Sequence, residues 1–181
     1  MMKHYNDTTY VILGILTTEC KSGYAIKQFI DRSLNHFWKI SYGQIYPTLK
    51  LIVQEELAEV RSFNSPGKPD KNEYYLTPKG IQELKSWLEI PIEQLPKERN
   101  EILLKLFFGR HQEQENQILL LQNYKVELDA RYHTYLSIEQ AITDLQDNDS
   151  IYWLFTLDYG KRVTKAAIDW CEFTIQKIST G

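Results

Sequence analysis

Apolar side chains recur every three or four positions along most of the chain, which predicts a mainly α-helical protein. In the first half we expect helices over residues 7–18, 22–34, 41–57 and 77–88. Two short β-prone runs, 57–63 and 73–76, lie between the third and fourth of these helices and predict a two-stranded hairpin. In the second half we expect three helices over about 97–110, 112–143 and 151–178.

Residues 41–57 carry the strongest local signal. Ser41 followed by Gln44 fits a capping box, which places the helix start at Ser41. Pro47 lacks an amide hydrogen and would crowd the preceding turn, so the first turn should be irregular. The apolar positions that seat the helix on a core are Ile45, Leu49 and Ile52. The opposite face is nearly free of acidic residues, and such a helix suits contact with an anionic partner such as DNA phosphate.

Three further helix starts are marked by capping residues. Asp7 or Thr8 can cap the first helix, Ser22 the second and Thr77, followed by Pro78, the fourth. Phe37 and Trp38 follow the second helix, and we expect them to pack between helices, with ligand contact as the alternative.

Two segments without helical pattern follow the third and fourth predicted helices: the turn of the hairpin, and a linker at residues 90–96. The turn between the two strands contains Pro66-Gly67, and Lys68 and Lys71 lie near its tip, where they could touch a phosphate backbone; a solvated surface loop is the alternative. Residues 90–96 contain two prolines with no room for a helix between them. We therefore expect one domain at 1–90 and a second, all-helical domain at 91–181.

The long helix at 112–143 carries an apolar stripe that continues for many turns. A single chain would leave much of this stripe in water, so we expect a second copy to cover it. The predicted dimerisation residues are Leu121, Tyr124, Leu128, Tyr132, Tyr135 and Ile138. The last helix places Phe155, Tyr159, Ala166, Trp170 and Phe173 along one side, which favours a loose helical bundle over a strict coiled coil.

The distribution of charge along the chain is weak evidence for contact with nucleic acid. The 181 residues carry a net charge of −3, but residues 1–85 hold 11 Lys and Arg against 9 Asp and Glu, while the rest holds 10 against 15. The excess acid therefore lies in the second half, and the first half can approach phosphate. Two isolated cysteines, no signal-like start and no long apolar run favour a cytoplasmic protein without a membrane segment.

Three pieces of the first half, in this order and spacing, identify a resemblance: Ser22-Gly23-Tyr24, Phe37-Trp38 and Ser41-Tyr-Gly-Gln-Ile-Tyr-Pro-Thr-Leu49. Together they resemble the PadR family of bacterial transcription regulators. The full layout is similar to its longer, AphA-like members. The resemblance implies a winged helix-turn-helix N-terminal domain with a two-stranded wing, followed by an all-α C-terminal dimerisation domain.

The same resemblance implies double-stranded DNA as the partner. The residues expected to meet DNA are Tyr24, Ser41, Tyr42, Gln44, Tyr46, Lys50, Lys68 and Lys71. Some family members bind aromatic small molecules, so Tyr152, Trp153, Tyr159 and Trp170 are candidates for an effector pocket, with core packing as the alternative. No cofactor, metal site or catalytic residue is expected. His111 and Glu115 lie one turn apart but lack further ligands at suitable spacing.

The sequence thus predicts a DNA-binding transcription regulator that acts as a homodimer on a palindromic operator. The competing hypothesis is a protein interaction module in which a winged-helix domain has lost DNA binding, since the positive charge of the first half is small.

Overall fold

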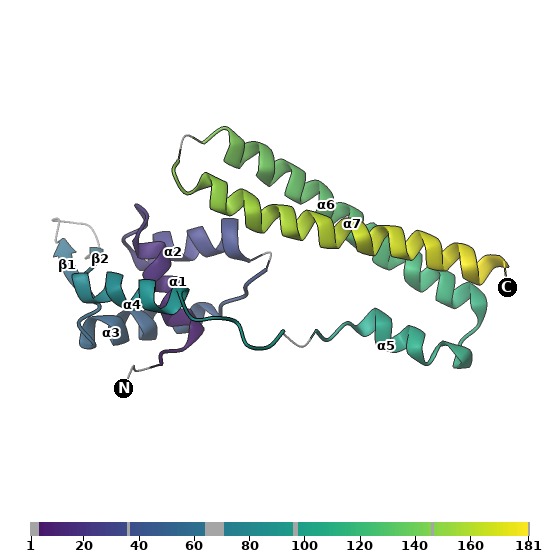
Figure 1. Ribbon diagram of the computed structural model, residues 1–181, viewed down its shortest axis with the longest axis horizontal. Helices are drawn as coiled ribbons and strands as arrows, with labels where there is room; N and C mark the ends of the chain where they lie inside the picture. The colour runs from purple at the N-terminus through teal and green to yellow at the C-terminus, as the bar shows by residue number, and fades with distance from the viewer. Residues whose placement is uncertain (1–3, 36, 64–70, 96–97, 146, 181) are drawn as a thin grey trace. The chain divides into compact units, whose positions relative to one another are not determined.

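The computed structural model describes residues 4–35, 37–63, 71–95, 98–145 and 147–180 (Figure 1). The chain divides into two compact units, residues 1–95 and 96–181. Most of the described residues are helical, and the two strands form one antiparallel hairpin, so the predicted mainly α fold class is confirmed. Along the described ranges, no helix is both long and apolar enough to cross a bilayer.

The N-terminal unit is a winged helix. Its elements are α1 (Asp7–Leu16), α2 (Gly23–Phe29), the π-helical η1 (Ile30–Leu34), the 3-10 turn η2 (Tyr42–Gln44), α3 (Ile45–Gln54), β1 (Ala58–Phe63), β2 (Lys71–Leu76) and α4 (Pro78–Leu88). The strands pair in register from Ala58 opposite Leu76 to Phe63 opposite Lys71. Their hairpin is the predicted wing.

One apolar core holds the N-terminal unit together. Its fully buried side chains come from α1, α2, η1, α3 and the start of the wing: Ile12, Leu13, Leu16, Ile26, Ile30, Ile45, Leu49, Ile52 and Leu57. The ring of Tyr10 stacks on Trp87 with centroids 4.7 Å apart, which fixes α4 against α1. The predicted inward positions of α3 are confirmed, because Ile45, Leu49 and Ile52 are all buried.

The helix starts agree with the sequence in two cases and differ in a third. The Ser22 hydroxyl accepts a hydrogen bond from the Ala25 amide, and Thr77 accepts one from the Gly80 amide, as expected. The first helix is capped by Asn6, whose side chain accepts from the Thr9 amide at 2.9 Å. The assignment to Asp7 or Thr8 was therefore wrong by one or two residues, since an Asn side chain caps equally well.

Glu56 turns the chain from α3 into the wing. It adopts a left-handed conformation with φ of 59°. The Leu57 amide donates to the Ile52 carbonyl at 2.8 Å and the Glu56 amide to the Val53 carbonyl at 3.1 Å, which together form a Schellman motif. The Leu57 carbonyl then accepts from the Thr77 amide at 3.1 Å. This joint brings the end of α3 and the start of α4 together.

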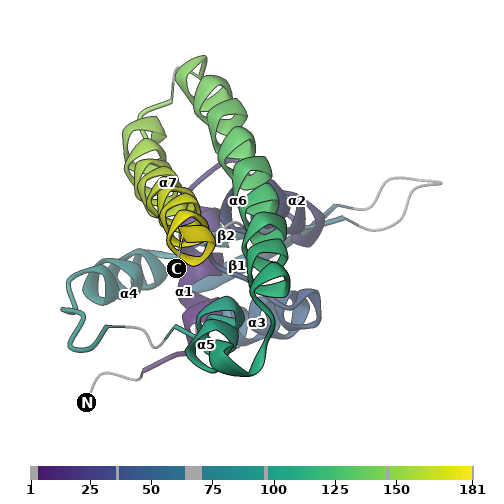
Figure 2. The ribbon, with the colours of Figure 1, turned by 90° about the vertical axis from the view of Figure 1, so that its right-hand side faces the viewer.

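The C-terminal unit is a long antiparallel helix pair with a short helix before it (Figure 2). Its elements are α5 (Glu101–Phe107), the 3-10 turn η3 (Gly109–His111), α6 (Gln114–Thr143) and α7 (Ser150–Thr180). Both views place α6 and α7 side by side. Its buried cluster joins α5 to both long helices through Ile102, Leu121, Leu128, Ile168 and Cys171.

This packing corrects the argument for dimerisation. The stripe on α6 is covered by α7 of the same chain: Leu121, Leu128 and Tyr135 are buried, and Tyr124, Tyr132 and Ile138 are partly buried. A second copy is therefore not needed to cover the stripe, and its length carries no argument for a dimer. The periodicity revealed an apolar face but could not tell which helix packs on it.

The expectation for Phe37 and Trp38 was also wrong. Phe37 is 59% exposed and Trp38 40% exposed. The chain turns after η1, where the Phe37 and Trp38 amides both donate to the Leu34 carbonyl, and this turn directs the two aromatic side chains outward. Helical spacing in residues 77–88 also predicts that Ile81, Leu84 and Trp87 or Leu88 face inward. Leu84 and Trp87 do pack on the core, but Ile81 and Leu88 are exposed.

Candidate nucleic-acid interface

The exposed face of α3 and of the 3-10 turn before it is the centre of the candidate interface. Gln44, Tyr46, Pro47 and Lys50 are all exposed, while the opposite face is buried. No acidic residue lies on this exposed face before Glu55. The surface therefore combines amide, phenol and ammonium groups, which bind base edges and phosphate oxygens.

The start of this helix differs from the capping box that the sequence predicts. Neither Ser41 nor Gln44 makes a side-chain capping bond, and only the Gln44 amide donates to the Ser41 carbonyl at 2.9 Å. Residues 42–44 form a 3-10 turn and the α-helix begins at Ile45. Pro47 explains the change, because it then occupies the third helical position, where its missing amide hydrogen costs no intrahelical bond. The irregular first turn expected from Pro47 is present.

Gly23 brings α2 and α3 into close contact. A Cβ atom at Gly23 would stand 2.7 Å from Cε1 of Tyr46, so any other residue at this position would displace the phenol ring. Tyr24, the next residue, is exposed, and its hydroxyl accepts a hydrogen bond from Gln28 at 2.9 Å. Tyr24 and Tyr46 therefore project from two neighbouring helix starts, and Gly23 sets their separation.

Tyr42 is placed differently from the other two tyrosines. Its hydroxyl donates to the Asp31 carboxylate, and the ammonium group of Lys27 lies 4.5 Å from its ring centroid. The hydrogen bond to Asp31 raises the pKa of Tyr42, because the carboxylate disfavours the phenolate. Tyr42 is thus held by groups of the preceding helical segment.

A backbone hydrogen bond fastens the wing to the segment that precedes α2. The Tyr74 amide of β2 donates to the Lys21 carbonyl at 2.7 Å, just before α2. Arg61 of β1 stacks its guanidinium 4.3 Å from the Tyr75 ring, and Lys21 approaches the same ring at 5.9 Å. Neither Arg61 nor Lys21 was among the residues predicted to meet DNA. Arg61 is the single cation within the β-prone run 57–63, and this position in the predicted wing is the sequence signal that could have indicated it.

The two lysines predicted at the wing tip are not placed by the structure. Lys68 lies outside the described residues, and Lys71 begins β2 with a side chain that also falls outside the description. Lys50, by contrast, is described and exposed.

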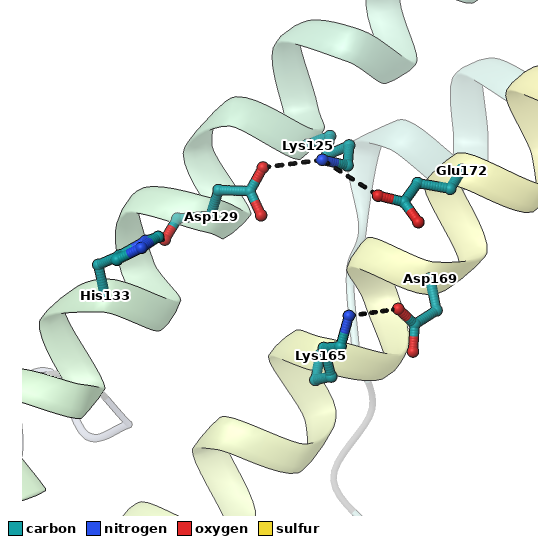
Figure 3. Close-up of polar contacts among 6 residues, drawn as sticks. All are labelled: Lys125, Asp129, His133, Lys165, Asp169 and Glu172. Atoms are coloured by element: carbon teal, nitrogen blue, oxygen red, sulfur yellow. Dashed lines mark hydrogen bonds and ion pairs between the residues drawn. The ribbon is translucent and has the colours of Figure 1, made fainter.

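In the C-terminal unit, polar bonds reinforce the α6–α7 pair (Figure 3). Lys125 of α6 contacts Asp129 at 3.0 Å and Glu172 of α7 at 3.2 Å. These hydrogen bonds raise the pKa of the Lys125 ammonium group. A second link between the helices joins Lys161 to Glu139 at 2.6 Å. Burial raises the pKa of the nearby Cys171 thiol.

The four aromatic residues predicted to line an effector pocket differ in exposure. Tyr152 and Tyr159 are exposed, whereas Trp153 and Trp170 are half-buried. An open groove of about 760 Å³ between α6 and α7 is lined by other residues, including Leu136, Phe155 and Arg162. Tyr152, Tyr159 and Trp170 instead lie on one face of α7, together with Phe155, Val163 and Phe173.

Comparison with known families decides the assignment. Residues 12–86 match the model of the transcriptional regulator PadR-like family, and residues 98–179 match the family described as virulence activator alpha C-term. The chain is 37% identical over 100 residues, 55% of its length, to the negative transcriptional regulator PadR of Bacillus subtilis. The chain therefore carries a PadR-like domain followed by a virulence activator alpha C-term domain.

Members of the PadR-like family with solved structures match nearly the whole chain. The Bacillus subtilis PadR in complex with operator DNA has a TM-score of 0.86 and 25% identity, with 96% of this chain and 99% of that one covered. The Vibrio cholerae virulence activator AphA has a TM-score of 0.71 and 26% identity, with 95% and 98% covered. The resemblance to longer, AphA-like PadR members is confirmed.

One sequence match is partial and another extends further. The alignment to the Bacillus regulator spans 54% of that protein's length. A probable transcriptional regulator of Mycobacterium tuberculosis is 27% identical over 178 residues, covering 90% of this chain and 93% of the relative. The PadR-like family consists of transcriptional regulators, which places this chain outside the enzyme classes.

Proposed function

We propose that this PadR-like protein binds a specific operator DNA through the exposed face of α3. The observation that carries the proposal is the projection of Gln44, Tyr46 and Lys50 from one helix face, beside Tyr24, while Ile45, Leu49 and Ile52 anchor the opposite face in the core. The Bacillus regulator with the same fold was solved in complex with operator DNA.

Each side chain on this face suits a different part of DNA. The Gln44 amide can pair with an adenine edge in the major groove, whereas Lys50 and the phenols of Tyr24 and Tyr46 suit phosphate. Arg61 of β1, Lys21 just before α2 and the lysines at positions 68 and 71, predicted from the sequence to lie near the wing tip, supply further positive charge for the DNA backbone. Sequence preference then depends on Gln44, and general affinity depends on the cations.

We further propose that the protein acts as a homodimer on a palindromic site. The first half has only a small positive excess, so a single unit neutralises few phosphates and binds weakly. Two linked copies act on the same duplex at a high effective concentration. A twofold pair also matches half-sites about one helical turn, or a multiple of it, apart.

The dimer surface that the structure supports best lies on α7. Its exposed apolar side chains form one stripe at helical spacing, composed of Tyr152, Phe155, Tyr159, Val163 and Phe173. An apolar stripe of this length is costly to leave in water, and a second copy of the same helix covers it symmetrically. Light scattering on full-length protein and a Tyr159→Glu variant tests this: a dimeric wild type and a monomeric variant are expected.

A selection experiment tests DNA binding against the competing hypothesis of an interaction module. Full-length protein is used to enrich duplexes from a random pool of 30-base-pair sequences, and the enriched duplex is compared with a scrambled one in gel shifts at two salt concentrations. We expect selective binding that weakens with salt. Replacing Gln44 by Ala should cost roughly 1 to 3 kcal/mol and relax preference at one base position. Failure to enrich any sequence would favour the interaction module.

We also propose a small aromatic effector. The Bacillus regulator was solved with p-coumaric acid, at 26% identity and a TM-score of 0.81 to this chain. Titration of p-coumaric acid into the gel shift should release the duplex if the same class of molecule acts here. Benzoate at equal concentration and ionic strength serves as the matched control, and equal effects of the two acids would argue against a specific site.

A further inference from the structure

The 3-10 turn at residues 42–44 sets the direction in which α3 begins, yet it lacks a side-chain cap. Ser41 and Gln44 make no capping bond, and both are exposed. Backbone bonds alone leave such a short turn free to move by small amounts. Because Gln44 and Tyr46 start from this turn, any movement there changes where both side chains point.

One side chain of the turn is tied to the preceding helical segment. The Tyr42 hydroxyl donates to Oδ1 of Asp31, which lies in η1, and Lys27 of α2 covers the Tyr42 ring at 4.5 Å. Asp31 also accepts a contact from the Asn35 side chain at 3.4 Å. The main chain of η1 is anchored in turn by Ile30, which is fully buried. The turn is thus connected through Tyr42 and Asp31 to the core.

This arrangement is unusual for a surface that meets a polyanion. A carboxylate close to DNA repels phosphate, so simple electrostatics predicts that Asp31 weakens binding. In addition, a hydroxyl group can donate only one hydrogen bond, and the Tyr42 hydroxyl donates its bond to Asp31. Tyr42 therefore cannot donate to a DNA phosphate at the same time. A direct DNA contact through the Tyr42 donor and the observed bond therefore exclude one another.

We propose that Asp31 is a positioning residue for DNA recognition: by accepting the Tyr42 hydrogen bond it holds the 42–44 turn and so aims Gln44 and Tyr46. The inference rests on the proposed DNA-binding function. It revises the role of Tyr42, which acts by fixing the turn. It also reverses the sign expected for removing an acidic side chain from a DNA-facing surface.

A double-mutant cycle in the full-length protein tests this inference. Tyr42→Phe, Asp31→Ala and the double variant are assayed on the enriched duplex and on the scrambled duplex. Each of the three should weaken binding to the enriched duplex, roughly three- to tenfold for one lost hydrogen bond, and the double variant should bind no more weakly than Tyr42→Phe alone, because both changes remove the same interaction. The salt slope should not change, since no phosphate contact is lost. Tyr24→Phe is the control, and its effect should multiply with that of Asp31→Ala.

The possible outcomes separate the inference from the function on which it rests. If wild-type protein does not distinguish the two duplexes, the proposed function fails. If it does, but Asp31→Ala binds equally or more tightly, or the double variant shows the product of the single effects, the positioning role is wrong. Asp31→Asn keeps an acceptor oxygen and should restore most of the affinity. Losses that follow a lower melting temperature and are not restored by Asn would give Asp31 a purely structural role and overturn the inference.

Discussion

Replacing Gly80 by alanine should strongly destabilise the N-terminal unit. Gly80 lies at the third position of α4, and a Cβ atom there would stand 2.0 Å from the Leu57 carbonyl oxygen and 2.9 Å from its carbon. Contacts this short do not occur, and the obstacle is backbone, so α4 and the start of the wing must separate by about 1 Å or more. The same carbonyl accepts the Thr77 amide, and that bond would be lengthened or lost.

The magnitude follows from these two effects. Overpacking of a tight contact costs about 1 to 3 kcal/mol, and a lost backbone hydrogen bond adds about 1 kcal/mol. Gly80→Ala should therefore lower the free energy of unfolding of the N-terminal unit by about 2 to 4 kcal/mol. Gly14 provides the matched control, because it lies inside α1 and a Cβ atom there meets nothing within 4 Å. Gly14→Ala should stabilise the same unit by up to about 1 kcal/mol.

Amide hydrogen exchange in the full-length protein is the appropriate assay, because it measures both units in one sample. Protection in α1 and α3 should fall for Gly80→Ala and rise slightly for Gly14→Ala. Protection in α6 and α7 should stay unchanged and so serves as the internal reference. Unchanged protection in Gly80→Ala, or an equal loss in both variants, would refute the close approach of α4 to the Leu57 carbonyl.

Three further substitutions test other joints of the N-terminal unit. Gly23→Ala should displace the Tyr46 ring and so weaken binding of the enriched duplex in gel shifts. The melting temperature should stay nearly unchanged, because the ring is exposed and can swing away. Wild-type affinity for the duplex would contradict this prediction. Glu56→Gly should raise the free energy of unfolding, measured with urea, by up to about 1 kcal/mol, because the left-handed conformation at φ of 59° is unfavourable for Glu. A loss of stability would mean that the exposed ion pair between Lys79 and Glu56 contributes more than the relief of this conformation. Burial and the bond to Glu55 raise the pKa of Tyr5 to about 12. The stability that Tyr5 contributes should therefore be fully present below about pH 10, where both states keep the proton, and should be lost between about pH 10 and 12 as the unfolded chain ionises. Urea unfolding at several pH values should show a smaller decline over this range for Tyr5→Phe than for the wild type.

Local chemistry was predictable where a residue acts on its own neighbours. The cap bonds of Ser22 and Thr77 span three residues, so the sequence alone determines them. The inward face of α3 followed from helical spacing in the same way. Ser41 does not cap the helix, because with Pro47 in the first turn the α-helix begins at Ile45. The capping preference of Ser41 and the restriction imposed by Pro47 are both local, and the sequence does not show which of them is stronger.

Long-range contacts were not predictable in this manner. The α6 stripe was correctly identified as apolar, but its coverage by α7, and not by a second copy, depends on the antiparallel packing of the two helices. Similarly, the bond between Tyr42 and Asp31 joins residues eleven positions apart, from different elements. The approach of Gly23 to Tyr46 joins α2 to α3. Periodicity contains no information about such pairs.

The sequence by itself therefore determined the helices, the wing, the core face of α3 and the family, because each depends on spacing within a short segment or on a motif of fixed order. The tertiary structure alone decided which apolar face remains exposed and which polar side chains meet. Burial and side-chain pairing depend on the distances between elements, and these distances arise only when the whole chain packs. For this protein, that packing leaves the exposed aromatic stripe on α7 and directs Tyr42 to Asp31.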